Sequence, residues 1–228
     1  MFVYSLAGLK MDGEALPDQE LEDNETTART GVYQLLARLV GSPDDETHAW
    51  ASTGEWPAQL TDAAKLLPYA FDFGQQPPLD EPSREAFEAE YLAAFEVGPG
   101  TGGPPVSLVS EHYNGGPSNN REEVLRFYEY FGLSTSAEDP RPGDHLATEL
   151  EFMKFLTFKE AVSSSPRLRA SFQRAQHDFL ERQLAPWMTR LKEKVAAADT
   201  WPFWQWAAAT TASFVLADAE YAASLQAG

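Results

Sequence analysis

Apolar residues recur along most of this chain at the three- and four-residue spacing that amphipathic helices require. The first such row is followed by Gly41, a helix stop, and consists of Val32, Leu35, Leu36 and Leu39. A second row begins near Asp144 and consists of Leu146, Leu150, Met153 and Leu156. Both rows predict helices that bury an apolar face, and similar rows follow elsewhere in the chain.

Helix-start signals divide the rest of the chain into further segments. The predicted starts are Ser42-Pro43, Trp56-Pro57, Ser83, Pro166 and Pro202. The helix that starts at Pro166 extends to residue 197, and Pro186 is expected to kink or divide it. Apolar residues between 124 and 131 predict one more helix, which Gly132 ends.

Glycine and proline are concentrated in the middle of the chain, over residues 97–120, where they rule out a continuous helix. No convincing run of alternating apolar and polar residues predicts a strand. We therefore predict an all-α fold: a single globular helical domain of about eight to ten helices over residues 26–228, with a long Gly/Pro loop in the middle. Residues 1–25 predict an acidic, weakly ordered tail. Segments 97–120 and 134–143 are candidate hinges, which leaves open a monomer or a domain-swapped dimer.

Composition narrows the classes of function. The 228 residues contain no cysteine, which excludes disulfides, thiolate metal sites and thiol catalysis. Lys and Arg number 17 against 35 Asp and Glu, which gives a formal net charge of −18. Such a chain would repel nucleic acid and anionic membranes and attract cationic partners such as basic peptides. Nine of the 17 cations lie between Lys154 and Lys194, so we expect a polarised molecule.

The sequence carries no recognisable targeting or membrane-spanning segment. Residues 1–10 lack a basic region, a long apolar core and a small-residue cleavage site, so they do not resemble a secretory signal. No apolar run approaches the ~20 residues that a bilayer-spanning helix needs. We therefore expect a cytoplasmic protein without stable membrane association.

Candidate chemistry is concentrated at the start of the second apolar row. Asp144 is placed as an N-cap or first-turn acid, and His145 and Glu149 share one helical face because they are four residues apart. Three interpretations remain open: a helix start with a hydrogen-bonded pair, a polar peptide-binding cluster, or a metal or acid–base site. The metal site would need Glu111 or His112 as a third ligand.

Two further segments are candidate parts of a binding groove. Tyr91 and Phe95 lie on one helical face just before the Gly/Pro loop, either as core aromatics or as the aromatic wall of a groove for an apolar peptide. Within the loop, Pro105 favours an extended course, and Ser107 and Glu111 follow it. A serine hydrolase would need a nucleophile elbow, which the sequence lacks. A loop that shapes a groove is therefore the better interpretation.

Taken in order, these segments resemble the TorD/DmsD/NarJ family of redox-enzyme maturation chaperones. The resemblance runs from Tyr-x3-Phe and Gly-Pro through Pro-Pro-x-Ser and Glu-x-Tyr, and is strongest in Asp-His-Leu-x-x-Glu-Leu-Glu-Phe-Met. The residues that carry it are Tyr91, Phe95, Gly98, Pro99, Pro104, Pro105, Ser107, Glu111, Tyr113 and residues 144–153. It covers roughly residues 28–220. Gly143 is a departure, because the family often has proline directly before Asp-His.

The resemblance implies an all-helical cytoplasmic chaperone with no enzymatic activity and no cofactor of its own. Its partners would be the apo catalytic subunit of a molybdopterin-dependent oxidoreductase and that subunit's twin-arginine signal peptide. The branch most similar in character serves chlorate, selenate, dimethyl sulfide or ethylbenzene enzymes. The predicted signal-peptide and client-binding residues are Tyr91, Phe95, Gly98, Pro105, Ser107, Glu111, Asp144, His145 and Glu149.

The chemistry of such a peptide agrees with this implication. A twin-arginine peptide joins a basic pair to an apolar stretch, so its receptor should offer carboxylates beside an aromatic groove. Glu111, Asp144 and Glu149 would supply the carboxylates. The alternative function is a metal-dependent hydrolase that uses His145, Glu149 and Glu111.

Overall fold

The computed structural model describes residues 9–11, 24–77, 83–97, 103–113, 119–137 and 139–227, and these residues are mainly helical. Their elements are β1 (Leu9–Met11), α1 (Glu25–Leu39), α2 (Asp45–Thr53), α3 (Trp56–Ala64), α4 (Arg84–Phe95), the 3-10 turn η1 (Ser110–His112), α5 (Asn119–Tyr130), β2 (Leu133–Thr135), α6 (Leu146–Val162), α7 (Pro166–Phe179), the π turn η2 (Leu180–Leu184), the 3-10 turn η3 (Ala185–Trp187), α8 (Met188–Ala197) and α9 (Pro202–Gln226). The predicted all-α single domain is confirmed. Most of the predicted acidic tail lies outside the described residues.

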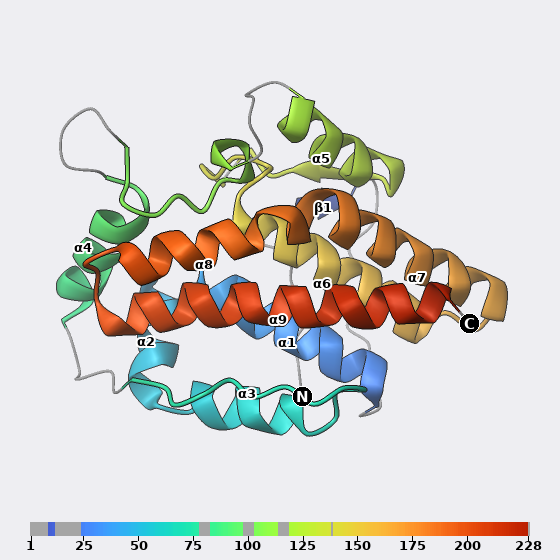
Figure 1. The fold of residues 1–228 in the computed structure, drawn as a ribbon, viewed down its shortest axis with the longest axis horizontal. Coiled ribbons are helices and arrows are strands. Elements are labelled where there is room, and N and C mark those ends of the chain that lie inside the picture. The colour runs from blue at the N-terminus through green and yellow to red at the C-terminus, as the bar shows by residue number, and fades with distance from the viewer. Residues whose placement is uncertain are drawn as a thin grey trace.

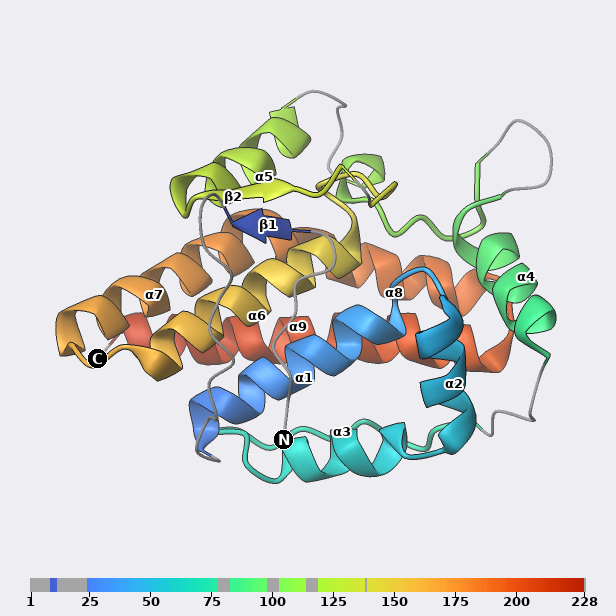
Figure 2. The same ribbon diagram turned by 180° about the vertical axis from the view of Figure 1, so that it is seen from behind.

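The long helices pack in layers around α6 (Figures 1 and 2). Helices α1 and α6 lie side by side, α7 packs against both α6 and α9, and α8 packs against α9. Helix α5 and the short strands cover one edge, while α2, α3 and α4 lie along the other edge and one end. Every residue from Leu146 to Phe158 is buried, so the start of α6, where candidate chemistry was predicted, is enclosed by protein.

Most helix starts agree with the sequence prediction. Ser83 accepts a hydrogen bond from the backbone N–H of Ala86 and caps α4, and α7 and α9 begin at Pro166 and Pro202. Helix α3 begins at Trp56 as predicted. The predicted start at Ser42-Pro43 is wrong, because the Asp44 side chain accepts the backbone N–H of Thr47 at 2.7 Å and α2 begins after it.

Pro186 divides the helix predicted over residues 166–197, as expected. The backbone leaves the α-helical pattern at Leu180, passes through η2 and η3, and resumes as α8 at Met188. Proline lacks an N–H and its ring clashes with a preceding carbonyl, so a regular helix cannot continue through it. After this interruption Trp187 is buried next to Glu149 of α6, within the candidate site described below.

Two short strands were not predicted. Leu9–Met11 pairs antiparallel with Leu133–Thr135, with Lys10 opposite Ser134. Three residues are too few to show an alternating pattern, so their pairing could not be read from the sequence. Leu9 is buried, which anchors a segment from the predicted N-terminal tail against the domain.

A buried ion pair joins α1 to α9. Arg29 Nε and Nη2 donate to the two carboxylate oxygens of Asp218 at 2.7 and 2.8 Å. The hydroxyls of Tyr33 and Tyr69 donate to the same carboxylate at 2.6 and 2.8 Å. Each oxygen of Asp218 thus accepts two hydrogen bonds, and Arg29 also lies 3.6 Å from Glu160. Such pairing compensates two charges that are almost completely removed from water.

Candidate functional site

The loop that contains η1 runs alongside the start of α6 and fixes its position. The backbone N–H of Leu146 donates to the carbonyl of Leu108 at 2.7 Å, and that of Ser110 donates to the carbonyl of Asp144 at 3.0 Å. Val109 and His145 form the isolated antiparallel bridge between these two segments. Two parts of the chain predicted to form one site are therefore in direct contact.

Asp144 is the centre of a charged cluster at this junction. Its Oδ1 accepts Arg121 Nε at 2.8 Å and its Oδ2 accepts the backbone N–H of Glu111 at 3.1 Å. Arg121 also lies 2.8 Å from the carboxylate of Glu111, so it bridges the two acids. Asp144 is fully buried, whereas the Arg121 side chain is 43% exposed. We call Glu111, Arg121 and Asp144 the arginine clasp.

The predicted N-cap role of Asp144 is wrong. Because both of its oxygens are used by residues of other elements, the next residue, His145, caps α6. The ring Nδ1 of His145 accepts the backbone N–H of Ala147 at 3.1 Å. Burial, with Arg141 nearby, lowers the pKa of His145 to about 3, so the ring is neutral near pH 7. Its proton therefore lies on Nε2, which has no hydrogen-bond partner among the described residues.

Gly143 has a local steric reason. A Cβ at this position would lie 2.7 Å from Leu125 Cδ2, closer than van der Waals contact allows. The backbone carbonyl of Gly143 also accepts the hydroxyl of Tyr128 at 2.8 Å. The departure from the family's usual proline thus coincides with close packing of α5 against the segment that leads into α6.

Glu149 lies one turn into α6 and is fully buried. Within the described part of the chain, neither carboxylate oxygen has a hydrogen-bond partner, and the same is true of Thr148 Oγ1 and Trp187 Nε1. Burial raises the pKa of Glu149 well above its usual value, although Ser110 and Trp187 nearby favour the charged form. The hydrogen-bonded pair of His145 and Glu149, one of the three interpretations, is therefore not formed among the described residues, and burial favours the protonated form of Glu149.

Tyr91 and Phe95 lie elsewhere, inside the core. Both are almost fully buried, and their rings are 5.2 and 6.1 Å from the ring of Trp204. The hydroxyl of Tyr91 donates to the carbonyl of Val40 at 3.2 Å. Their helix is tied to the loop through the backbone N–H of Val106, which donates to Ala94. These aromatics support the loop and do not line a surface, whereas Gly98, also predicted here, lies outside the described residues.

Ser107 forms several hydrogen bonds within its own loop. Its hydroxyl accepts the backbone N–H of Val109 at 3.1 Å and lies 2.5 Å from Nδ1 of His112, while its carbonyl accepts the hydroxyl of Tyr113 at 2.8 Å. Ser107 is buried and Pro105 is exposed. Among the residues that the structure describes, no group of three His, Asp or Glu side chains is placed to hold a metal ion. The donor set that the hydrolase alternative requires is therefore not assembled.

Sequence reasoning missed Arg121 and Trp187. Arg121 is the single Lys or Arg between positions 85 and 125, in a chain of net charge −18, and this isolation was a usable signal. Trp187 gave no such signal, because its proximity to Glu149 depends on the interruption at Pro186.

No helix among the described residues is both long and apolar enough to cross a membrane.

Comparisons with known proteins agree with the predicted resemblance. A model of the family described as nitrate reductase delta subunit matches residues 54–193. The chain is 39% identical to the selenate reductase assembly chaperone protein of Thauera selenatis over 79% of this chain and 82% of the relative. It is 37% identical to the chlorate reductase assembly chaperone protein of Ideonella dechloratans over 79% and 82%. It is 26% identical to the chaperone protein TorD of Shewanella pealeana over 85% and 89%.

The chain belongs to this family of reductase assembly chaperones. The predicted TorD/DmsD/NarJ membership is confirmed, and so is the prediction of a chaperone in place of a hydrolase. The two relatives named for selenate and chlorate reductases are more similar in sequence than TorD, in agreement with the predicted branch.

Proposed function

We propose that this chain is a cytoplasmic chaperone for the apo catalytic subunit of a molybdopterin-dependent reductase. In this proposal it binds the subunit and its twin-arginine signal peptide until the cofactor is inserted, and only then permits export. Family membership and the names of the relatives support the chaperone role. The observation that carries the peptide-binding role is the arginine clasp, in which two carboxylates hold a guanidinium that is 43% exposed.

The clasp suggests how a peptide arginine would be recognised. Arg121 holds the place that an incoming guanidinium would take between Glu111 and Asp144. Because Asp144 is fully buried, its charge needs a cationic partner at all times. A signal-peptide arginine would therefore exchange with Arg121, and charge-assisted hydrogen bonds would be conserved in the exchange. Arg121 would thus compete with the peptide arginine for the site between Glu111 and Asp144.

The other predicted site residues would then support the clasp without pairing with the peptide arginine. His145 and Glu149 follow Asp144 in the chain, and among the described residues both have buried polar atoms without a hydrogen-bond partner. Pro105 and Ser107 shape the loop that carries Glu111. Tyr91 and Phe95 would hold that loop from inside the core without touching the peptide.

Calorimetric titration of a synthetic twin-arginine signal peptide tests this proposal. We expect Asp144→Asn and Glu111→Gln each to lower affinity by tenfold or more, because each removes a carboxylate from the guanidinium site. We expect Arg121→Gln to raise affinity, because it removes the internal competitor. Arg126→Gln is the matched control: it makes the same charge change on α5, but Arg126 pairs with the exposed Glu122 and lies outside the clasp.

The outcomes separate the clasp from general electrostatics. Equal effects of Arg121→Gln and Arg126→Gln would mean that net charge alone governs binding, and unchanged affinity in Asp144→Asn would remove the clasp from the site. A peptide with both arginines replaced by glutamine should bind neither the parent nor the variants. Capture of the client from native cytoplasm, with mass spectrometry, would identify the reductase, and light scattering would decide between monomer and swapped dimer.

A further inference from the structure

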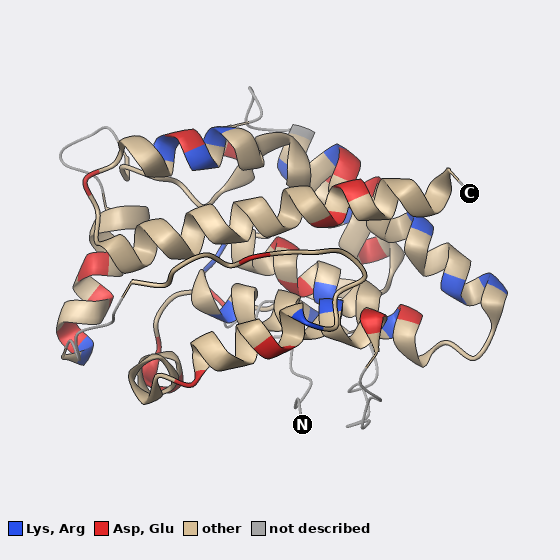
Figure 3. Cartoon of the chain, turned by 60° about the horizontal axis from the view of Figure 1, so that its bottom comes forward, with Lys and Arg blue, Asp and Glu red and all other residues tan. Residues whose placement is uncertain are grey.

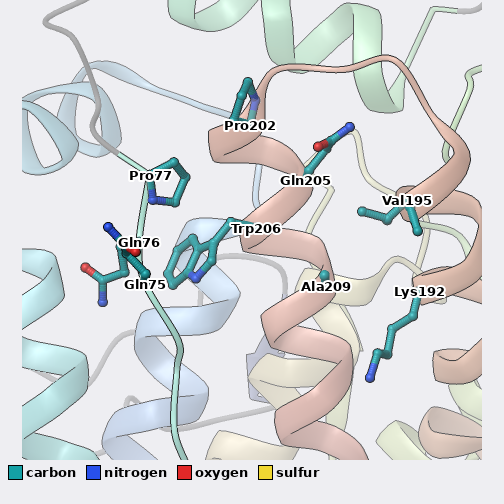
Figure 4. A pocket seen from close by; sticks show the side chains of 10 residues that line it. Gln75, Gln76, Pro77, Lys192, Val195, Pro202, Gln205, Trp206 and Ala209 are labelled. Carbon is teal, nitrogen blue, oxygen red and sulfur yellow. The ribbon is translucent and has the colours of Figure 1, made fainter.

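A pocket of about 530 Å³ opens between α8, the start of α9 and residues 75–77, and it shares no residue with the arginine clasp. Lys192 and Val195 of α8 stand on one side, Gln75, Gln76 and Pro77 stand on the other, and Trp206 and Ala209 of α9 lie between them (Figure 4). The remaining lining residues are Ala196, Pro202 and Gln205. We call this the α8–α9 pocket.

The walls of the α8–α9 pocket are held in place by hydrogen bonds and packing. Trp206 Nε1 donates to the backbone carbonyl of Phe73 at 2.9 Å, which fixes the segment leading to Gln75. Gln205 Nε2 donates to the carbonyl of Ala198 at 2.6 Å, which fixes the turn between α8 and α9. The ring of Trp206 also packs 5.0 Å from that of Trp56. A pocket whose walls are tied down in this way is preorganised to bind.

The α8 side of the pocket is basic, although the chain as a whole is acidic. Helix α8 carries Arg190, Lys192 and Lys194 against one carboxylate, Glu193, and α9 carries no charge from Pro202 to Ala217 (Figure 3). Six cations on other elements pair with carboxylates, namely Arg29, Lys65, Arg84, Arg121, Arg126 and Arg141. Within the described residues, Lys192 forms no ion pair. Its ammonium is therefore available to an anion at the mouth of an apolar pocket.

We propose that the α8–α9 pocket is a second docking site, for an extended segment of the client in which an apolar side chain adjoins an aspartate or glutamate. The apolar side chain would pack on Trp206 and Val195, and the carboxylate would pair with Lys192. The three glutamine amides on the rim would bond the backbone of the segment. The identity of the partner rests on the proposed chaperone function, but the pocket itself is independent of the arginine clasp.

Complementary charge favours this occupant. The signal peptide is cationic and would be repelled by the α8 cations, whereas an acidic segment would be attracted by them. The volume lies within the range of about 300–1,000 Å³ that is typical of ligand pockets, enough for a few side chains. A client could thus be held at two places of opposite charge.

The absence of native cysteine permits a site-specific test. Ala196→Cys places a single thiol at the exposed rim, where an environment-sensitive fluorophore would report occupancy. The probes are three peptides, acetyl-Gly-Leu-Phe-Asp-Gly-amide and its Asn and Lys analogues. We expect the Asp peptide to bind at least tenfold more tightly than the other two. We also expect Lys192→Glu to weaken its binding at least tenfold.

Arg167→Glu is the matched control, because Arg167 is exposed on α7, outside the pocket, and makes the same change in charge. It should leave affinity for the Asp peptide within twofold of the parent. Equal losses in both charge variants, equal binding of the Asp and Asn peptides, or no binding at millimolar peptide would overturn the proposal. So would a signal that grows with protein concentration alone, since it would assign the pocket to a second copy of the chain. Titration of the twin-arginine peptide on the same variants shows separately whether the proposed function fails.

Discussion

Two arginine–carboxylate centres of this fold differ in how completely they are paired. At Asp218, each oxygen accepts two hydrogen bonds, and Arg29 is buried with it. At Asp144, each oxygen accepts one, and the partner Arg121 is 43% exposed. Among the residues that the structure describes, His145, Thr148, Glu149 and Trp187 have buried polar atoms without a hydrogen-bond partner, and the first three of these residues lie within five positions of Asp144.

The difference distinguishes a structural centre from the proposed binding centre. A completely paired buried network locks its helices, because any movement would leave a charge without a partner. A centre whose cation reaches solvent can exchange that cation for another without exposing its buried acid. The unpaired atoms near the clasp have a cost in stability, which a protein selected for folding alone would have little reason to keep.

The largest expected effect is at the structural centre. Arg29→Met leaves Asp218 buried without its cation, so we expect a loss of about 3–5 kcal/mol in the free energy of unfolding. Denaturant unfolding measures it. The double variant Arg29→Met/Asp218→Asn removes both charges and keeps an acceptor for the tyrosines, so it should lose less than the single variant. A double variant that loses more would show that the pair is stabilising beyond mutual compensation.

A smaller and pH-dependent effect is expected at Glu149. Its raised pKa means that the fold favours the protonated acid, so stability present below pH 4.5 is lost as the pH rises toward the folded-state pKa. Glu149→Gln removes this dependence, and its advantage over the parent should grow by up to about 1.4 kcal/mol per pH unit as the pH rises above the ordinary pKa of 4.5.

The same pH series isolates Glu149 from its neighbour. His145 contributes with the opposite sign, because its lowered pKa makes stability fall as the pH drops from 6.5 toward about 3. Measurements above about pH 6.5 therefore leave the His145 contribution nearly constant. Parallel stability curves for the parent and Glu149→Gln would contradict a buried, protonated Glu149.

The smallest effects compare one hydroxyl from each centre. Tyr69→Phe removes one of four hydrogen bonds to Asp218, and we expect a loss of about 1 kcal/mol. Thr148→Val removes a buried hydroxyl that has no partner in the described part of the chain, so we expect no loss or a slight gain. Thermal or denaturant unfolding of both variants measures the contrast. A loss in Thr148→Val as large as in Tyr69→Phe would mean that its hydroxyl is paired after all.

Local signals explain which parts of the fold were predictable. Proline fixes φ and lacks an N–H wherever it occurs, so the starts at Pro166 and Pro202 and the break at Pro186 could be read directly. The start of α2 was misassigned because two candidate caps, Ser42 and Asp44, stand close together and only their geometry distinguishes them.

The site was predictable only in part, because its decisive contacts are distant in sequence. Asp144 meets Arg121 and the backbone of Glu111 across 23 and 33 positions. Helix periodicity therefore placed Asp144 correctly at the start of α6 but assigned its carboxylate to the wrong donor. Tyr91 and Phe95 share a face as predicted, yet a period alone does not say whether that face meets the core or solvent.

Arg121 also bears on how a client would leave. Because Arg121 would occupy the site of the peptide arginine, the peptide could bind only when Arg121 is displaced. The apparent Kd would equal the intrinsic Kd divided by the fraction of molecules in that open form. If the closed form were favoured about a hundredfold, the apparent Kd would rise about a hundredfold, or about 2.7 kcal/mol. In the proposed function, the clasp would close again when a folded client began to withdraw its peptide, and this would oppose rebinding. Hand-over would then need no nucleotide hydrolysis, only competition between two arginines for one buried acid.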